Sequence, residues 1–351
     1  MTVMREYGSE FDYTVNQRVV QNKWTAFRNF HLLRCGRDAV FAAATVLKER
    51  GIENVMVPAL SCHSMYEGFV HCGLNVTFYP LDTQFNPKLT DGKQSGKHAI
   101  LFMLYYGVTD LEFVQRLIRE HKECISIVDI THSVWDQTVY ALQADVLIGS
   151  MRKSVGVVNG GIFLSDRFAV QAKQGTNEFT EFRTRGFRIK NSYNETSDPE
   201  QKFAYRTLFA EAERSLDRQN GVYCADPESV ETMMSVNAEE LRRKRFANFK
   251  HLARLLAQDD SVKPLCGQLP ETAVPFSFPI LVEDQLKLQT ELARLGVYAP
   301  VLWPIDDRAK AACEFSKTVS ENMLSLPVDQ RYTIEDMNVI YQRLKQALYG
   351  E

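Results

Sequence analysis

The sequence predicts an α/β fold, in which a large domain with a mostly parallel sheet is followed by a small α+β domain. Apolar strands alternate with helical segments through the first half of the chain, and a smaller pattern of the same kind follows residue 236. The strands also lack polar alternation, as in AILFML at 99–104. Continuous apolar strands are typical of parallel sheets, because helices bury both faces of such sheets.

The elements expected in the large domain follow one another closely. Residues 1–30 show no clear period, and we expect them to form an arm. An Ala-rich stretch that ends at Gly51 predicts the first helix, since glycine is a common helix stop. β-Branched and aromatic content predicts the strands. We expect helices at 38–51, 63–73 and 110–122, and strands at 53–59, 74–82, 98–107, 124–133, 144–150 and 160–165.

Polar and charged residues predominate between residues 177 and 235. The run at 183–202 has no apolar period, and we expect a long loop or a substrate lid there. A long basic helix is expected further on, and we interpret its charges as a solvated or interdomain face. Helices are expected at 202–217, 238–258, 284–296 and 333–348, and strands at 273–282 and 324–329. The predicted organisation is an arm (1–30), a large domain (31–235) and a small domain (236–351).

Composition and charge exclude several classes of protein. Of the 351 residues, 45% are hydrophobic and 24% are charged, which is typical of a folded chain rather than a disordered one. The 41 basic and 44 acidic residues give a formal charge of −3, so no basic excess favours nucleic-acid binding. No run approaches the roughly 18 apolar residues of a membrane span, and the polar start lacks the apolar core of a secretion signal.

The cysteines and histidines predict neither a disulfide framework nor a metal site. The seven cysteines are scattered without a Cys-x-x-Cys pair, which indicates reduced thiols in the cytoplasm. Cys62 and His63 are adjacent, as are His71 and Cys72. Adjacent residues on a helix point roughly 100° apart, which fits one tetrahedral ion poorly. The sequence also lacks the glycine-rich loops of nicotinamide and nucleoside-triphosphate sites.

Three segments carry candidate chemistry. Asp129 ends the apolar strand CISIVD, and open parallel sheets bind ligands at the carboxyl ends of their strands. Lys153 follows the apolar segment ADVLIG. A helix N-terminus attracts phosphate through its free amides and its dipole. The first predicted helix opens with Gly36, Arg37 and Asp38.

Together these segments match the requirements of pyridoxal 5'-phosphate (PLP). This cofactor needs a lysine for covalent attachment, an acid that keeps its ring nitrogen protonated, and a helix N-terminus for its phosphate. The helix start, Asp129 and Lys153 come in that order, and one strand with its connections separates the last two. We therefore predict a PLP site at these three segments.

The chain resembles the DegT–DnrJ–StrS family of PLP-dependent sugar aminotransferases, which have fold type I of the aspartate aminotransferase superfamily. The similarity extends from Cys35 to the C-terminus and lies in the segments CGRDAV, VPALSCHS, VDITHS, SMRKSVGVVNGG, VYAPVLWPI and LSLPVDQRY. The resemblance implies that Lys153 holds the cofactor and acts as general base and acid. It also implies that Asp129 pairs with the pyridine nitrogen and that His132 lies near the ring hydroxyl.

The resemblance implies the reaction and the partners as well. An amino acid would donate nitrogen to a keto acceptor, usually a nucleotide-linked sugar, in the biosynthesis of surface polysaccharides or secondary metabolites. The sites would be shared between the two chains of a homodimer. The basic cluster that contains Arg188 and Lys190 is either a solvated face or a cover of the site, and in the second case these two residues would meet the diphosphate of the acceptor. Trp303 and Arg331 are further substrate candidates.

The sequence departs from the family pattern at two positions near the cofactor. His63 lies in the segment where many relatives have an aromatic residue that stacks on the cofactor, and it is the candidate for that place. The family often has a serine five residues before the lysine, whereas Ser150 stands three residues before it. The resemblance implies that Ser150 can still donate a hydrogen bond to the phosphate of the cofactor. Asn191 and Tyr205 are the candidates for the residue that reaches the phosphate of the partner chain.

Two other functions remain open. One is a different PLP reaction, such as sugar deoxygenation. The deoxygenating relatives carry histidine at the lysine position, so Lys153 argues against that reaction. The other is a PLP-binding regulatory protein without turnover, and the retention of both Asp129 and Lys153 argues against it.

Overall fold

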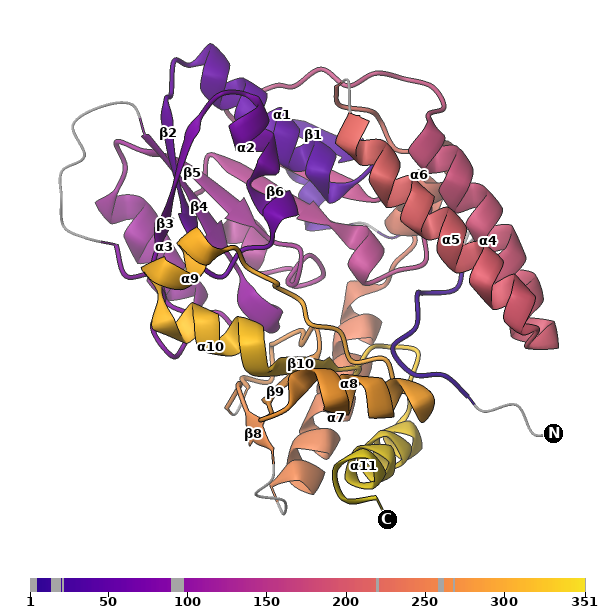
Figure 1. The fold of residues 1–351 in the computed structure, drawn as a ribbon. Coiled ribbons are helices and arrows are strands. Elements are labelled where there is room, and N and C mark those ends of the chain that lie inside the picture. Colours follow the sequence, from indigo (N-terminus) through magenta and orange to yellow (C-terminus); the bar gives the residue numbers. More distant parts are fainter. Residues whose placement is uncertain are drawn as a thin grey trace.

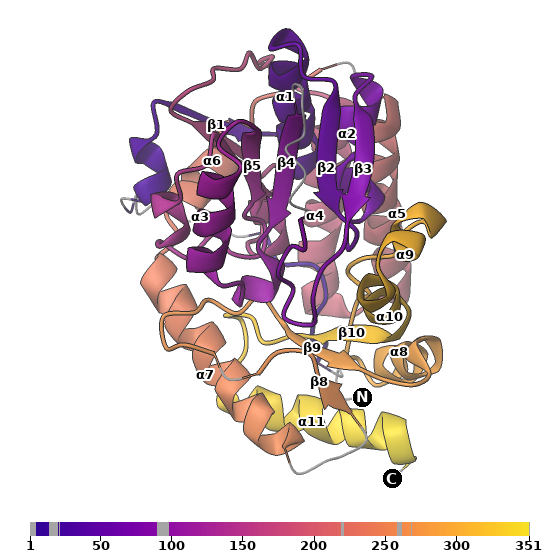
Figure 2. The same ribbon diagram turned by 90° about the vertical axis from the view of Figure 1, so that its left-hand side faces the viewer.

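The computed structural model describes residues 5–13, 20, 22–89, 98–218, 221–257, 262–267 and 269–350 (Figure 1). It contains a seven-stranded sheet with the order β1-β7-β6-β5-β4-β2-β3 and a three-stranded sheet with the order β10-β9-β8. Figure 2 shows the large sheet above the small one, with α7 and α11 along the outer side of the small sheet. In the described part of the chain, no helix is both long enough and apolar enough to cross a membrane.

The large sheet is mostly parallel, as predicted. Strands β3, β2, β4, β5 and β6 pair in parallel, whereas β7 runs antiparallel to both of its neighbours. The strands are β1 (Asn29–Leu33), β2 (Asn54–Pro58), β3 (Asn75–Tyr79), β4 (His98–Met103), β5 (Ile125–Asp129), β6 (Val146–Ser150) and β7 (Gly161–Ser165). The sequence did not predict β1, whose first two residues fall inside the expected arm.

Helices cover both faces of the large sheet, which explains the continuous apolar strands. Leu101 and Ile127 point to the face where α1 (Gly36–Glu49) and α2 (Glu67–His71) pack. Phe102 and Val128 point to the opposite face, where α3 (Leu111–Glu120) contributes Val114. Successive residues of a strand point to opposite faces, so each strand of this sheet needs apolar residues at every position.

The long loop expected at 183–202 is wrong, because this stretch is helical. Helices α4 (Glu178–Thr196) and α5 (Pro199–Ser215) form an antiparallel hairpin that projects from the body in Figure 1. The side chain of Asn177 caps α4 by accepting a hydrogen bond from the amide of Thr180. Helix α4 buries Arg183 and Lys190 together with Phe179 and Phe187. Buried cations interrupt the apolar period, which is why the sequence pattern did not indicate a helix.

The small sheet is antiparallel and consists of β8 (Lys263–Pro264), β9 (Phe278–Leu281) and β10 (Met323–Leu326). The predicted helices at its flanks are confirmed as α7 (Ala238–Leu256), α8 (Gln285–Arg294) and α11 (Ile334–Tyr349). Three further helices were not predicted: α6 (Pro227–Met234), α9 (Asp307–Ala312) and α10 (Glu314–Asn322). Short 3₁₀ helices lie at η1 (Lys23–Ala26), η2 (His63–Met65), η3 (Tyr105–Gly107), η4 (Val139–Ala141), η5 (Met151–Lys153) and η6 (Leu216–Arg218).

The described arm residues 5–13 pack against the rest of the chain. Tyr7 exchanges backbone hydrogen bonds with the segment after α8, at Gly296 and Tyr298. Its side chain is buried and donates to Asp336 at the start of α11. The expected arm residues 1–4, 14–19 and 21 lie outside the described residues. The described arm thus joins the small-sheet region rather than standing free of it.

Candidate active site

The carboxyl ends of two strands and the start of α1 meet at one edge of the large sheet. Asp129 is the last residue of β5, Ser150 is the last residue of β6, and Gly36 is the first residue of α1. A Cβ atom on Gly36 would lie 3.0 Å from the Cβ of Ser150, so this close approach favours glycine. The three candidate segments of the sequence therefore converge where ligands bind in open α/β sheets.

Asp129 is a buried carboxylate, and few hydrogen bonds or opposite charges offset the cost of its burial. It is 6% exposed, and its Oδ1 accepts a hydrogen bond of 2.8 Å from the amide of Thr131. Burial raises the pKa of Asp129, while hydrogen bonding by Thr131 and the charge of Lys153 oppose this shift. Within the part of the chain that the structure describes, no lysine or arginine forms an ion pair with Asp129. A cationic ligand group would stabilise its charged form.

His132 is held in one orientation beside this carboxylate segment. Its Nδ1 accepts a hydrogen bond of 3.1 Å from the amide of Tyr106. Its ring stacks on Phe276 with 3.8 Å between ring centroids and 4° between ring planes. Burial, aided by the positive charges of Lys153 and Arg245, lowers the pKa of His132 well below its usual value. The ring is therefore neutral, and because Nδ1 accepts, we assign the proton to Nε2, which becomes a hydrogen-bond donor.

Lys153 lies at the end of η5, in the connection between β6 and β7. The amide of Met151 donates to the carbonyl of Gly160, which closes this connection into a tight loop. A Cβ on Gly161 would clash with the carbonyl of Cys35, just before α1. The glycine pair after the lysine thus lets the loop pass directly beside the start of α1. The Lys153 side chain is exposed to the cavity described next.

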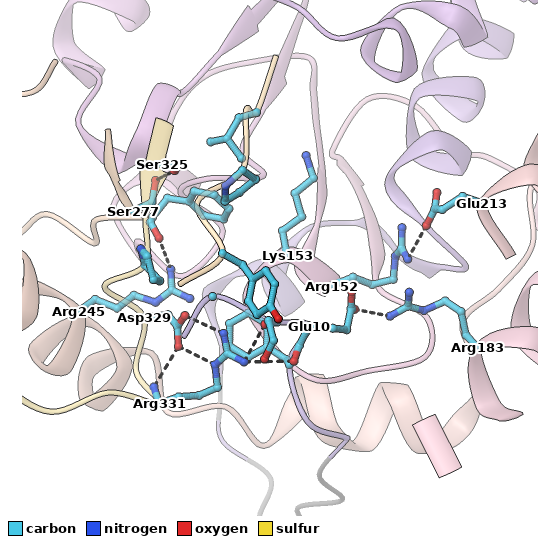
Figure 3. Close-up of a pocket in the computed structure, with 18 residues that line it drawn as sticks. Glu10, Arg152, Lys153, Arg183, Glu213, Arg245, Ser277, Ser325, Asp329 and Arg331 are labelled. Carbon is cyan, nitrogen blue, oxygen red and sulfur yellow. Dashed lines mark hydrogen bonds and ion pairs between the residues drawn. The ribbon is translucent and has the colours of Figure 1, made fainter. Parts of the chain in front are cut away.

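A cavity of about 360 Å³ opens beside Lys153 and is lined by charged side chains (Figure 3). Three ion pairs lie in its wall: Arg152–Glu213 at 3.0 Å, Arg183–Glu10 at 2.7 Å and Arg331–Asp329 at 2.8 Å. They come from the arm, η5, α4, α5 and the segment after β10. In the view of Figure 3, Lys153 lies between Arg245 and Arg331 on one side and Arg152 and Arg183 on the other.

Sequence reasoning missed most of this charged wall. Arg152, Arg183, Arg245, Glu10 and Glu213 were not among the candidate residues. Arg245 belongs to a helix whose charges we interpreted as a solvated or interdomain face, but its side chain is 2% exposed. That interpretation holds for Arg242, which pairs with Glu239 on the surface. The sequence signal that could have found it is spacing, because Arg245 stands four residues after Leu241 and four before Phe249 on the apolar face of the helix.

The remaining cofactor candidates, near α1 and η2, do not line this cavity. Arg37 forms ion pairs with Glu67 and Asp217. Asp38 is buried and forms an ion pair of 2.7 Å with Arg34. His63 lies on η2, where its side chain is 68% exposed and 3.9 Å from Glu67. Arg37, Asp38 and His63 are therefore not among the described residues that line the cavity.

Of the four substrate candidates predicted from the sequence, Arg331 is the one that lines the cavity. Lys190 is buried and pairs with Asp12 of the arm, while Arg188 is exposed, and neither lines the cavity. Trp303 is 1% exposed and packs on Tyr105, Tyr106 and His132 as part of the core. Arg331 does line the cavity, where it also donates to the arm carbonyls of Ser9 and Glu10. The candidates Asn191 and Tyr205 lie on α4 and α5, respectively, outside the cavity.

Comparison with known proteins identifies the architecture. No family model and no curated protein matches the sequence. Solved structures do match. PseC of Helicobacter pylori, an aminotransferase involved in the biosynthesis of pseudoaminic acid, has a TM-score of 0.66 at 12% identity over 99% of this chain and 100% of that one. A DegT DnrJ EryC1 StrS aminotransferase of Brucella abortus has a TM-score of 0.61 at 15% identity, over 95% and 92%. The chain has the fold of these aminotransferases.

A third match concerns the cofactor. A Streptococcus pneumoniae protein described as a sugar aminotransferase was solved in PLP and PMP forms, the aldehyde and amine forms of the cofactor. The PMP form has a TM-score of 0.65 at 14% identity, over 95% of this chain and 91% of that one. The fold class expected from the sequence, an α/β aminotransferase fold with a mostly parallel sheet, is confirmed.

Proposed function

We propose that this chain is a PLP-dependent aminotransferase of the DegT–DnrJ–StrS family. It moves an amino group from an amino acid to a nucleotide-linked keto sugar. The observation that carries the proposal is the meeting of Asp129, Lys153 and the start of α1 at one sheet edge, in a fold shared with sugar aminotransferases. The assignment of PseC to pseudoaminic acid biosynthesis supports a role in surface polysaccharide or secondary metabolite pathways.

The residues at this edge fit PLP by their chemistry. Lys153 supplies the amine for covalent attachment, and the buried Asp129 carboxylate, which forms no ion pair with a described residue, suits a protonated ring nitrogen. The Nε2–H of His132 suits the ring oxygen. The first amides of α1 and the hydroxyl of Ser150 suit the phosphate, because the first four amides of a helix have no partner within the helix.

When bound, PLP supplies an electron-accepting ring next to the carbon that exchanges its nitrogen. The chain's own residues then move and hold protons. With PLP bound, Lys153 Nζ would act as the base that takes the proton from Cα of the amino donor and as the acid that returns it. Asp129 keeps a proton on the ring nitrogen through a charge-assisted hydrogen bond, which is stronger in a buried site than in water.

We further propose that the enzyme works as a cytoplasmic homodimer, with the division into arm, large domain and small domain given above. The α4–α5 hairpin supports the dimer, because it projects from the body and carries Phe203, which is 75% exposed (Figure 1). A two-fold interface would bury such a side chain in both copies. Analytical ultracentrifugation should give a dimer at micromolar concentration. An active, PLP-loaded monomer would contradict this arrangement.

The reaction is tested in two half-reactions with the purified, PLP-loaded protein. L-Glutamate should convert the cofactor absorbance to that of the amine form and release one equivalent of 2-oxo acid per active site. A nucleotide-linked keto sugar should then restore the original spectrum. Failure to bind PLP would refute the cofactor assignment. A working donor half-reaction with no response to any keto sugar would refute the sugar acceptor and leave an aminotransferase of smaller substrates.

A further inference from the structure

Lys153 carries the proposed chemistry, but its position is not fixed through its own side chain. It lies at the end of η5 and projects into the cavity (Figure 3). Within the described part of the chain, no residue forms a hydrogen bond or an ion pair with its amine. A group that transfers protons must be held closely, since a misplacement of about 1 Å can cost on the order of 100-fold in rate. The place of the amine therefore depends on how the backbone around Lys153 is anchored.

The anchor is Ser154, the residue directly after Lys153. It is 1% exposed, and its hydroxyl accepts a hydrogen bond of 2.7 Å from Nε1 of Trp135. The hydroxyl also donates to the carbonyl of Met151 at 3.1 Å, as does the Ser154 amide at 2.9 Å. The indole nitrogen can only donate, so the hydroxyl keeps its single proton for Met151. These bonds close the short turn that carries Lys153 and tie it to Trp135.

Ser154 is also held from the opposite side, by the segment after β10. Its carbonyl accepts a hydrogen bond of 2.7 Å from Nε2 of Gln330. The Oε1 of Gln330 accepts a hydrogen bond of 2.8 Å from Nε of Arg245 on α7. The two contacts fix the orientation of the Gln330 amide, because only its nitrogen can donate and only its oxygen can accept. Ser154 is therefore bound to both the large-sheet and the small-sheet regions.

Trp135 connects the lysine turn to the segment that carries the other proposed cofactor groups. It lies six residues after Asp129 and three after His132, in the connection between β5 and β6. Its side chain is 2% exposed, and a closely packed ring cannot shift without moving its neighbours. The bond from Trp135 to Ser154 thus fixes the lysine turn relative to the Asp129 segment, although the two are separate in the sequence.

We propose that Trp135 is a positioning residue for Lys153, an assignment that rests on the proposed function. Its indole N–H holds Ser154 and thereby keeps the amine of Lys153 in place relative to Asp129. Trp135 is not among the described residues that line the cavity, so its effect on the reaction passes through Ser154. Proton transfer by Lys153 should depend on this bond, whereas binding of the amino donor should not.

A second buried tryptophan provides the matched control. Trp24 in η1 is 0% exposed, but its Nε1 has no hydrogen-bond partner among the described residues. Trp24→Phe and Trp135→Phe remove the same atoms from a buried ring, and only the second also removes a hydrogen bond to Ser154. Effects that both variants share are effects of packing, and effects confined to Trp135→Phe belong to the bond.

The first measurement needs no cofactor. Amide hydrogen exchange of the peptide that contains residues 151–155, read by mass spectrometry, reports local opening of the lysine turn. Trp135→Phe should speed this exchange several-fold, as expected from the loss of one buried hydrogen bond, and Trp24→Phe should not. Adding Trp135→Phe to Ser154→Ala should change the exchange little further, because the bond between these two residues is already absent.

The second measurement uses the PLP-loaded protein and L-glutamate. Trp135→Phe should lower the rate constant of the donor half-reaction at saturating L-glutamate about tenfold, less than a full 1 Å misplacement would. The half-saturating concentration should stay unchanged, since a bond that serves only the transition state does not alter binding. The visible circular dichroism of bound PLP should also fall at equal occupancy, because the achiral cofactor shows this signal only when it is held in one orientation. If Trp135→Phe does not fold, Ser154→Ala carries the same comparison.

The outcomes separate this inference from the proposed function. Equal changes in Trp135→Phe and Trp24→Phe would assign Trp135 to packing and overturn the inference. An unchanged rate constant, or a change in the half-saturating concentration alone, would also overturn it. If exchange of the lysine turn rises only in Trp135→Phe but the wild-type protein transfers no nitrogen, the positioning of Lys153 stands and the aminotransferase proposal falls.

Discussion

The two sides of the candidate site are assembled in different ways. The strand-end side consists of Asp129, His132 and Ser150, which lie within 22 residues of one another on two neighbouring strands and their connections. The charged side is assembled from remote segments, and Arg183 and Glu10, for example, are 173 residues apart. The first side carries groups suited to a cofactor, and the second carries groups suited to substrates. Chemistry that is local in the chain could be predicted, whereas substrate recognition depends on how distant segments pack.

The largest effect should come from the strand-end side. Asp129→Asn removes the charge that would hold the ring proton, and turnover should fall on the order of 10²-fold or more while some PLP is retained. Asp136→Asn, in the same connection after β5, is the control, because the side chain of Asp136 accepts its hydrogen bonds from Thr138 in a local turn. Steady-state kinetics and PLP occupancy measure the two effects. An unimpaired Asp129→Asn enzyme would remove the reason for placing the chemistry on this side.

A smaller effect is expected at the start of α1. An added Cβ in Gly36→Ala would press on Ser150 and move the helix amides from the end of β6. An anion at a helix N-terminus gains up to ~2 kcal/mol, so PLP affinity should weaken about tenfold. Gly267→Ala is the control, since a Cβ there meets no atom within 4 Å. Titration of the cofactor-free proteins with PLP measures both constants, and equal affinities would argue against a phosphate at this helix.

The strand-end residues were predictable because each lies at or just after the carboxyl end of an apolar strand. Parallel sheets bind their ligands at these strand ends. Gly36, Asp129 and Lys153 could be recognised in order, and the structure brings their elements together. His63 was placed by analogy with an aromatic position, and the structure puts it on an exposed turn of η2. Its burial depended on how η2 packs, which the local sequence does not specify.

The charged side could not be predicted for a related reason. In the run Arg242-Arg243-Lys244-Arg245, only Arg245 has the spacing of the apolar face, four residues from Leu241 and from Phe249, and its charge argues against burial. Packing buries Arg245, while Arg242 and Lys244 pair with Glu239 and Glu240 on the surface. Helix α4 was hidden in the same way, because its buried face includes Arg183 and Lys190. Buried charges break the periodicity from which elements and burial are predicted.

His132, on the strand-end side, should make the free energy of unfolding depend on pH. Its pKa in the folded state lies well below that in the unfolded chain, about 6.5, mainly because of burial. The unfolded chain therefore takes up a proton that the folded protein does not, and stability falls as the pH drops below about 6.5, by up to ~1.4 kcal/mol per pH unit. Urea unfolding at pH 7.5 and 5.5 should show this loss in the wild type. His132→Gln should lose about 1.4 kcal/mol less between these pH values, and an identical loss would mean that the histidine is protonated in the fold.

The smallest effect should come from the arm. In the pair Arg183–Glu10, the arginine side chain is 3% exposed and the glutamate side chain is 34% exposed. Glu10→Gln should therefore lower the free energy of unfolding by only about 1 kcal/mol. It should leave PLP affinity unchanged, since Glu10 lines only the charged side of the cavity. A double-mutant cycle with Arg183→Gln isolates the pair. A loss of PLP affinity in Glu10→Gln would show that the two sides are not independent.

The attachment point of the cofactor tests the central claim most directly. Borohydride reduction of the PLP-loaded protein fixes the cofactor to the amine that holds it, and peptide mass spectrometry then locates the label. The account predicts a single labelled peptide that contains Lys153, and no label or transamination in Lys153→Ala. A label on another lysine, or none in the wild-type protein, would contradict the assignment of this sheet edge as the active site.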